Sequence, residues 1–351
     1  MFAPVLHVLP LTTIVRKRVL PVSGKVNMHV NQRVNPTDVV AEANFAREHV
    51  LLDVARQFGI SAEAADKLIK VKEGESLAQG ALVAEKSGLI PQKIKTPRAG
   101  RVMVAGSGQV LMEVGNTHIE LRAGLPGVVT QVIPDRGVII RTAGALIQGV
   151  WGNGRIDNGL MVSLLEKPED VLSAGRLDVS LRGSVILAGQ VRDLDTLKTA
   201  AELPVRGLIL SSLSSSLTAS AYQMRYPILV TEGFGALPMN SAAFKLLTTN
   251  NKREATVNAE HFDRYTGSRP EVIIPLPISS EPDEPNPFEI FAVGQPVRMR
   301  RPPYAGMVGT IANLPAGLSL LPSGLRAASA DVKLENGENV LVPLVNLEVV
   351  G

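Results

Sequence analysis

The stretch Gly183-Ser-Val185-Ile-Leu-Ala188-Gly189 is a short, uninterrupted apolar run that ends in glycine. Two similar runs follow it, Gly207-Leu-Ile-Leu210 and Pro227-Ile-Leu-Val-Thr231. Each run is followed by a segment with the apolar spacing of an amphipathic helix, at residues 192–203, 217–225 and 241–250. Continuous apolar strands that alternate with helices are typical of a parallel sheet covered on both faces. We therefore expect a small α/β domain over residues 161–277.

Ligands of such sheets bind beyond the carboxyl ends of the strands. The third run ends in Thr231-Glu232-Gly233-Phe234-Gly235, where two glycines would let backbone N–H groups approach a phosphate. Glu232, Gly233 and Gly235 are therefore candidate ligand-binding residues of an enzyme or sensor. The chain has no P-loop lysine and no complete glycine fingerprint. Tight strand-to-helix turns explain these glycines equally well.

Composition narrows the chemistry that the chain can perform. Its 351 residues are enough for two or three domains of ordinary size. The chain has no cysteine, which excludes disulfides, iron–sulfur clusters and a cysteine nucleophile. Its five histidines do not pair at helical spacing, so neither a metal nor a cofactor is predicted. The net charge of +3 does not by itself demand a nucleic-acid or membrane partner.

The chain gives no sign of membrane insertion or secretion. No stretch of 18 apolar residues occurs, and the basic cluster Arg16-Lys17-Arg18 follows the first apolar segment instead of preceding it, as it would in a secretory signal. We therefore expect a cytoplasmic protein without a membrane partner.

Residues 1–160 contain internal repeats. Pro21-Val-Ser-Gly24-Lys-Val26 matches Pro97-Arg-Ala-Gly100-Arg-Val102, and Leu125-Pro-Gly127-Val-Val129 echoes both. Each unit reads as a turn followed by a short alternating strand. Together with Val71-Lys-Glu-Gly74-Glu-Ser-Leu77-Ala-Gln-Gly80, the pattern resembles the barrel-sandwich hybrid of biotinyl and lipoyl carrier domains, over about residues 19–143.

The resemblance implies a carrier lysine on one hairpin, and Lys86 is nearest to that position. Lys86 lies in Ala84-Glu85-Lys86-Ser87 and lacks the flanking residues of both carrier families. We therefore interpret this part as a scaffold that carries no cofactor. Residues 44–70 interrupt the repeats and read as an inserted helical hairpin, with Gly59 and Ser61 at its turn. The turn also resembles a helix-turn-helix unit, but the second segment is too acidic to favour DNA binding.

Residues 278–290 combine proline with acidic residues and read as a linker. The segment after the linker, Val293-Gly294-Gln-Pro-Val297-Arg-Met-Arg-Arg301-Pro-Pro-Tyr304-Ala-Gly306, resembles a KOW motif, the SH3-like barrel element of NusG-type transcription factors. It departs from the family at Pro302, where glycine is usual. The barrel would cover residues 291–351, with an insertion near residues 313–330 and a hairpin turn at Asn336-Gly337. The whole layout resembles that of bacterial proteins with no assigned activity.

The sequence therefore predicts a multidomain, β-rich α+β protein: a split barrel-sandwich hybrid, a small α/β domain and a KOW barrel. The KOW resemblance implies a non-enzymatic adaptor that engages RNA, a nucleoprotein or a protein. Arg298, Arg300, Arg301 and Tyr304 would form the contact, the arginines with phosphates and the tyrosine by stacking. Residues 291–351 contain five Lys/Arg and four Asp/Glu, a net charge of only +1, so a protein contact is equally open. The alternative is a self-assembling structural protein, a homo-oligomer built through exposed strand edges.

Overall fold

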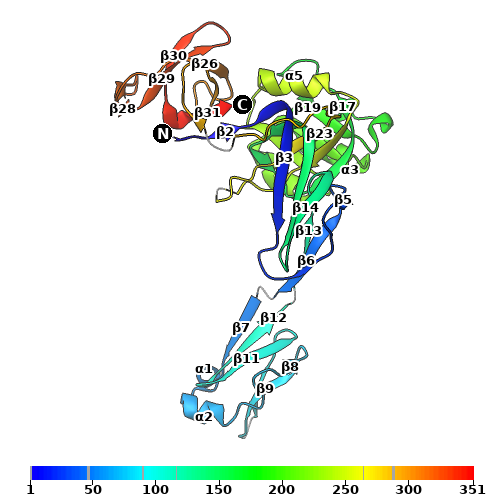
Figure 1. Ribbon diagram of the computed structural model, residues 1–351. Coiled ribbons are helices and arrows are strands. Elements are labelled where there is room, and N and C mark those ends of the chain that lie inside the picture. Colours follow the sequence, from blue (N-terminus) through cyan, green and yellow to red (C-terminus); the bar gives the residue numbers. More distant parts are fainter. Residues whose placement is uncertain (1, 46–47, 89–90, 116, 264, 287–288) are drawn as a thin grey trace.

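The computed structural model describes residues 2–45, 48–88, 91–115, 117–263, 265–286 and 289–351. The chain is rich in strands, which form several separate sheets (Figure 1). The largest sheet has twelve strands. Ten of them run in the order β16 (Trp151–Gly152), β21 (Ile228–Phe234), β20 (Gly207–Leu213), β19 (Val185–Val191), β17 (Ile156–Ser163), β22 (Glu254–Asn258), β23 (Glu271–Pro275), β15 (Gly137–Gln148), β14 (Gly127–Ile133) and β5 (Arg33–Val34). The other two are β18 (Val171–Leu172), beside β19, and β3 (Val8–Val19), beside β15.

The expected parallel strands lie toward one end of this large sheet. Strands β17, β19, β20 and β21 are parallel neighbours, with Val185 opposite Gly207 and Leu208 opposite Ile228. Helices cover both faces of this part of the sheet. One core contains residues of α3 (Leu194–Glu202) and α4 (Thr218–Gln223), and the core on the other face contains residues of α5 (Ser241–Thr249). The short 3₁₀ helices here are η1 (Ala174–Arg176), η2 (Val179–Leu181) and η3 (Ser215–Leu217).

The large sheet does not stop at the expected domain boundary near residue 160. Strand β17 itself crosses that position, and β3, β14 and β15 continue the same sheet through β23. The first 160 residues therefore do not form a separate unit. A small sheet beside them consists of β13 (Thr117–Arg122), β6 (Val39–Phe45) and β4 (Lys25–Val26).

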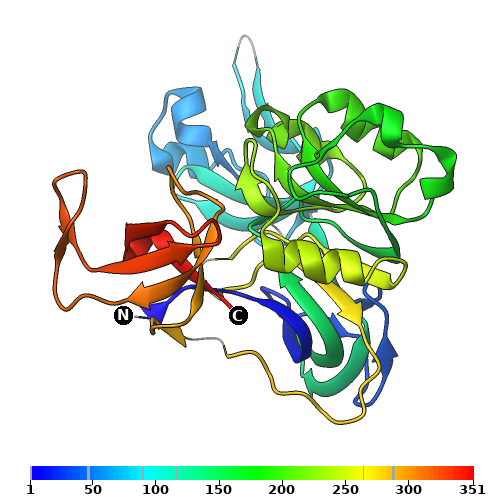
Figure 2. The same cartoon turned by 90° about the horizontal axis from the view of Figure 1, so that it is seen from above.

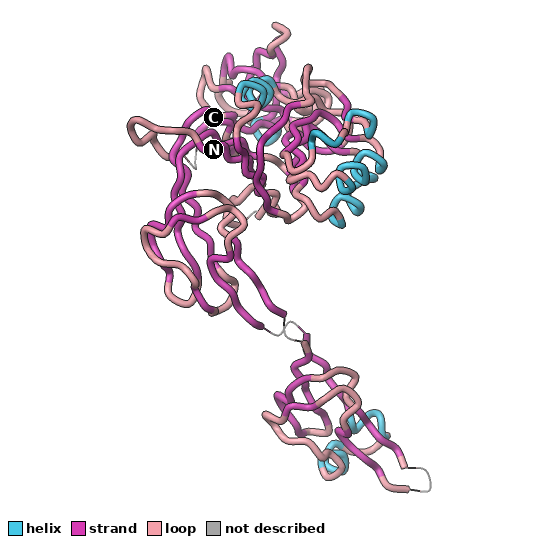
Figure 3. Tube along the Cα trace, turned by 90° about the vertical axis from the view of Figure 1, so that its right-hand side faces the viewer, coloured by secondary structure: helices cyan, strands magenta, loops and turns pink. Residues whose placement is uncertain are grey.

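Residues 48–114, here called the distal module, extend away from the rest of the chain (Figures 1 and 3). They form one sheet of β7 (Glu48–Asp53), β12 (Gln109–Val114), β11 (Gly100–Gly106) and β8 (Ser76–Leu77), and a hairpin of β9 (Leu82–Lys86) and β10 (Gln92–Lys95). Two short helices, α1 (Val54–Phe58) and α2 (Ala62–Asp66), pack on a core of their own. Lys86 donates from Nζ to the carbonyl of Phe58 at 3.0 Å, which ties its amine to the module.

The expected helical hairpin over residues 44–70 is too long. Residues up to Phe45 belong to β6, and residues 48–53 form β7, which pairs along its whole length with β12. In β7 the side chain of Leu51 is exposed and that of Leu52 is buried, the period-two pattern of a strand. The apolar spacing of this segment fits a helix and a strand equally, and the pairing with β12 decides between them.

The three repeated glycines share one structural role. A Cβ atom on Gly24 would lie 2.3 Å from the carbonyl oxygen of Glu42, and one on Gly100 would lie 2.2 Å from that of Glu113. Gly127 approaches the carbonyl of Arg141 in the same way, at 2.3 Å. Each repeat therefore needs glycine because the backbone of another strand passes too close for any side chain.

Residues 291–351, together with β2 (Val5–Leu6), form the C-terminal module (Figure 2). Its sheet runs in the order β2, β31 (Leu347–Val350), β25 (Pro296–Met299), β26 (Val308–Asn313), β29 (Ser329–Leu334) and β30 (Asn339–Pro343). The expected hairpin at Asn336-Gly337 joins β29 to β30. The insertion forms a separate hairpin of β27 (Ser319–Leu320) and β28 (Arg326–Ala327), and η4 (Leu344–Asn346) precedes β31. Strand β1 (Phe2–Ala3) pairs with β24 (Glu289–Ile290).

Candidate functional site

Two candidate residues from distant parts of the sequence meet where the C-terminal module lies against β21. Val297 and Met299 of β25 face the core of the module, so Arg298 between them projects toward β21. Arg298 donates from Nη1 to Glu232 Oε2 at 2.7 Å and to the carbonyl of Thr231 at 2.9 Å. The guanidinium of Arg298 is thus hydrogen-bonded to the α/β part of the chain, and only 4% of the residue is exposed.

A second carboxylate completes this buried network. Arg298 donates from Nε to Glu348 Oε1 at 2.7 Å, and Arg269 lies 3.5 Å from the other oxygen of Glu348. Burial alone would lower the pKa of Arg298, but the carboxylates of Glu232 and Glu348 outweigh it and raise that pKa above its usual value. Two negative charges therefore hold this guanidinium inside the protein.

The other oxygen of Glu232 is also used. Glu232 Oε1 accepts hydrogen bonds from the backbone N–H of Asn240 at 3.1 Å and from Asn240 Nδ2 at 2.6 Å. Asn240 is the N-cap of α5, because its side chain accepts from the N–H of Ala243. The network therefore joins the C-terminal module to β21 and to the start of α5. Ser241 adds a bond from the same helix, donating to Glu335 at 2.5 Å.

The contact between Arg298 and Glu232 lies at the carboxyl end of β21, where the sequence predicted a ligand-binding site. Strand β21 continues through Phe234, so Gly233 lies inside the strand opposite Ser212, and only Gly235 follows it. Their φ angles of 136° and 109° are ones that glycine adopts without strain. With Glu232 buried and paired, its carboxylate is not free to orient a hydroxyl or a metal. The structure brings the candidate residue Glu232 and the candidate residue Arg298 together, and the two side chains form an ion pair with each other.

The other expected contact residues lie on the outside of the C-terminal module. Arg300 and Arg301 are exposed, and neither has an ion pair within the part of the chain that the structure describes. Tyr304 is half-buried and packs against the core of the module. Burial lowers the pKa of Arg269, and the positive charges of Arg298 and Arg300 lower it further against the effect of Glu348.

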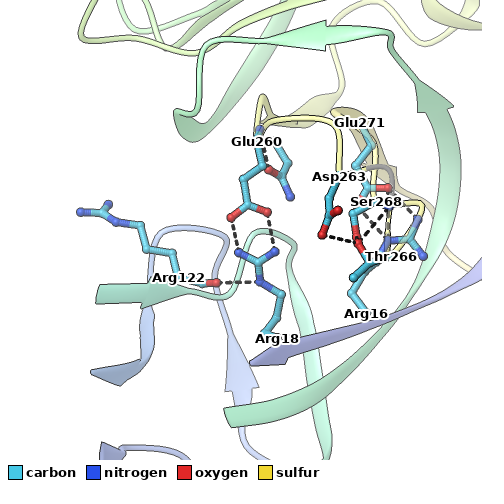
Figure 4. Close-up of polar contacts among 9 residues, drawn as sticks. Arg16, Arg18, Arg122, Glu260, Asp263, Thr266, Ser268 and Glu271 are labelled. Carbon is cyan, nitrogen blue, oxygen red and sulfur yellow. Dashed lines mark hydrogen bonds and ion pairs between the residues drawn. The ribbon is translucent and has the colours of Figure 1, made fainter. Parts of the chain in front are cut away.

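A polar cleft of about 620 Å³ lies beside β3. Residues 15–18 of β3 line one side and residues 265–269 line the other, and the carboxylates of Glu260, Glu271 and Glu284 also line it. Figure 4 shows the ion pairs of Arg16 and Arg18 at this place. Arg16 and Arg18 are two residues apart, so they project from the same face of the strand. Arg16 reaches Glu271 at 2.6 Å, and Arg18 reaches Glu260 at 2.5 Å through two nitrogens.

Sequence reasoning did not find this cleft. In the sequence, the basic cluster at residues 16–18 indicates only that the first apolar segment is not a secretory signal. The partners of Arg18 and Arg16 are 242 and 255 residues away. No local spacing signals such pairs. The two ion pairs are bidentate and hold Glu260 and the start of β23 against β3. Lys17, on the opposite face, is exposed and forms no ion pair with any residue that the structure describes.

The insertion of the C-terminal module presents an apolar surface. Leu318, Leu320 and Leu325 are 66%, 63% and 68% exposed, and all three lie on or beside the β27–β28 hairpin. Residues 314–325 contain no charged side chain. The sequence placed an insertion here but did not predict that its leucines would be left outside the core.

Over the described ranges, no group of three His, Cys, Asp or Glu side chains could hold a metal ion. No helix in those ranges is long and apolar enough to cross a membrane.

Comparison with known proteins adds no identity. No model of a protein family matches this chain, and no curated protein matches it.

Proposed function

We propose that this protein is a non-enzymatic adaptor that binds a protein partner through its C-terminal module, which we interpret as a KOW-type SH3-like barrel. The observation that carries the proposal is the exposed leucine hairpin formed by β27 and β28. Three leucines more than 60% exposed on an uncharged twelve-residue segment form the kind of apolar surface that marks a protein interaction site.

The isolation of this hairpin supports the same conclusion. Among the strands of the described residues, β27 and β28 pair only with each other, as a two-stranded sheet apart from the six-stranded one. Hairpins of two strands are only marginally stable in water without further packing. A partner that covers the leucines would supply that packing.

The buried Arg298 network gives the module a fixed base. It ties β25 and β31 to β21 and α5 through charged groups that are almost fully shielded from water. A module anchored in this way presents its outer surface in one orientation, which lowers the entropy cost of binding a partner.

The test compares three leucine-to-serine changes with a matched change elsewhere. We expect Leu318→Ser/Leu320→Ser/Leu325→Ser to lose a protein that co-purifies with the wild-type chain after cross-linking in the source cells. Val179→Ser is the control, since Val179 is 76% exposed but lies on the α/β part. The proposal fails if the triple variant retains every partner of the wild type.

The same leucines could be covered by a second copy of the chain, which is the self-assembly alternative. Light scattering over a range of concentrations separates the two. A strict monomer at high concentration excludes self-assembly, whereas an oligomer that the leucine changes dissolve would favour it over an adaptor.

RNA binding is a second candidate function. The side chains of Arg300 and Arg301 favour it, because both are exposed and form no ion pair with any residue that the structure describes. Arg298 does not belong to this test, because its loss would disturb the buried network. If RNA is the partner, Arg300→Ala/Arg301→Ala should lower RNA co-purification at moderate salt, where phosphate contacts dominate affinity. If the same amount of RNA co-purifies with this variant as with the wild type, the RNA-binding hypothesis is wrong. An enzyme or sensor at the 231–235 turn is not favoured, because Glu232 is fully paired.

A further inference from the structure

The outer edge of β3 is open over part of its length. β3 pairs with β15 along one edge, with Arg16 opposite Ile140 and Arg18 opposite Val138. Its other edge has no strand partner within the described ranges. Because Thr13 donates its N–H away from β15, the backbone groups of the odd-numbered residues point to this outer edge. Those of Val15, Lys17 and Val19 therefore face outward.

The open positions can be named. The carbonyl of Val15 accepts a bond from Arg16 Nη1 at 2.9 Å. The N–H of Val15 and both backbone groups of Lys17 have no hydrogen-bond partner among the residues that the structure describes. An open strand edge is a template for another extended chain.

The neighbouring part of the same edge already holds an extended acidic segment. Residues 276–286, here called the strap, run along the outside of the molecule toward the C-terminal module (Figure 2). Thr13 donates from its N–H to the carbonyl of Asp283 at 3.1 Å and from its hydroxyl to that of Pro282 at 2.5 Å. Glu281 also forms an ion pair with Arg141 of β15. The edge of β3 thus binds a proline-containing, acidic chain up to Thr13.

The positions beyond the strap are basic. Arg16, Lys17 and Arg18 follow directly, and Lys17 is exposed and unpaired within the described ranges. The 620 Å³ cleft opens along residues 15–18 and is walled on its far side by the 265–269 loop, which includes Arg269. Arg16 and Arg18 are already paired with Glu271 and Glu260, so a chain lying on this edge would have space beside it and the exposed ammonium of Lys17 next to it.

We propose that the edge of β3 from Val15 to Val19 is a docking site for an extended acidic peptide of a partner protein, which would add to the sheet as a further strand. Main-chain bonds to Val15 and Lys17 would supply affinity, as in other cases of strand addition. The exposed ammonium of Lys17 would favour an acidic partner, just as Arg141 of the neighbouring strand β15 pairs with Glu281 of the strap. This surface lies on a different part of the molecule from the leucine hairpin, and the inference does not rest on the proposed function.

The experiment uses the full chain and a fluorescein-labelled peptide of alternating valine and glutamate. Two control peptides accompany it, one with lysine in place of glutamate and one N-methylated on alternate backbone nitrogens. Fluorescence anisotropy should show binding of the acidic peptide only. The proposal is overturned if no binding occurs up to 1 mM, or if either control peptide binds equally well.

Two variants of one residue separate the backbone from the charge. In Lys17→Pro the outward N–H is lost but the pairing with β15 is kept, because proline is tolerated on the open side of an edge strand. We expect at least a roughly tenfold loss of affinity in Lys17→Pro and a smaller loss in Lys17→Ala, since strand addition depends mainly on backbone bonds. Equal binding by Lys17→Pro and the wild type overturns the proposal. The N-methylated peptide still tests it if Lys17→Pro does not fold.

A polyanion control addresses simple charge attraction. A decamer of uridine should bind weakly and with the same affinity to Lys17→Pro and Lys17→Ala, since phosphates need no strand edge. If the acidic peptide also binds Lys17→Pro and Lys17→Ala with the same affinity, the site is an electrostatic patch and the strand-addition proposal is wrong.

Discussion

Arg298 and Glu232, 66 residues apart in the chain, meet at 2.7 Å in a pair whose side chains are 5% and 0% exposed. Each was a candidate binding residue of a different domain, and each binds the other. The pair shows that the C-terminal module and the α/β part share a buried electrostatic contact in place of two independent sites.

Removal of the guanidinium should be costly. Arg298→Met leaves Glu232 and Glu348 buried without their cation, and we expect the free energy of unfolding to fall by about 3–5 kcal/mol. Urea unfolding followed by circular dichroism measures the change. The control is Arg206→Met, which breaks the 3.2 Å pair with Asp157 at a position where Arg206 is 54% exposed, and should cost less than about 1 kcal/mol. Similar losses in both variants would contradict the structural role of Arg298.

Two glycines of the same strand should differ sharply in their tolerance of alanine. Gly100→Ala puts a Cβ atom 2.2 Å from the carbonyl oxygen of Glu113, whereas a Cβ on Gly106 meets no heavy atom within 4 Å. We expect Gly100→Ala to destabilise the distal module by about 1–3 kcal/mol, because the backbone must shift, and Gly106→Ala to have little effect. Thermal unfolding of the two variants gives the comparison. Equal melting would mean that the close approach of the strands is not required.

The stability of the fold should depend on pH through His7. Burial lowers the pKa of His7, and the nearby charges of Arg16 and Arg269 lower it further, against the carbonyl of Gly351 and the carboxylate of Glu271. The unfolded chain then binds a proton more readily than the folded one, so stability is full above the unfolded pKa of about 6.5 and falls as the pH drops toward the folded value. Unfolding midpoints of the wild type should decline over this window, and those of His7→Gln should decline less. Parallel curves for the two proteins would exclude His7 as the source.

The hydroxyl of Tyr226 should contribute to stability. It donates to the carbonyl of Leu197 at 2.8 Å inside the core, and burial raises its pKa. Tyr226→Phe removes the bond and leaves that carbonyl without it, at a cost of about 1 kcal/mol. Tyr222→Phe is the control, because Tyr222 is 43% exposed and its hydroxyl only accepts a bond of 3.2 Å from Trp151 Nε1 near the surface. Circular dichroism follows unfolding in both variants, since the Tyr222 ring contacts Trp151 and its loss would alter the tryptophan fluorescence. A neutral Tyr226→Phe would show that water replaces the lost donor.

Some of these features were visible in the sequence. The apolar runs around residues 185, 208 and 228 predict the parallel strands, because strands buried on both faces need apolar side chains at every position. Asn336-Gly337 predicts its hairpin, because the turn requires those residue types. The segment at 48–53 did not reveal itself as a strand, because its apolar spacing fits a helix as well and only its pairing with β12 distinguishes them.

What the sequence determined by itself is therefore local: the runs that become strands, the helices between them, the turns, and the glycines of the repeat. Tertiary structure alone decided the rest. It placed Val5 beside Val349, Arg16 beside Glu271, and Arg298 between Glu232 and Glu348. Periodicity arises from neighbours along one strand or helix and can be read from the chain. The partner of a charged side chain, by contrast, cannot be read from the sequence, because ion pairs between distant residues form only when folding brings both side chains together. For this reason Arg298, which the sequence predicted to bind RNA, instead joins two parts of the protein.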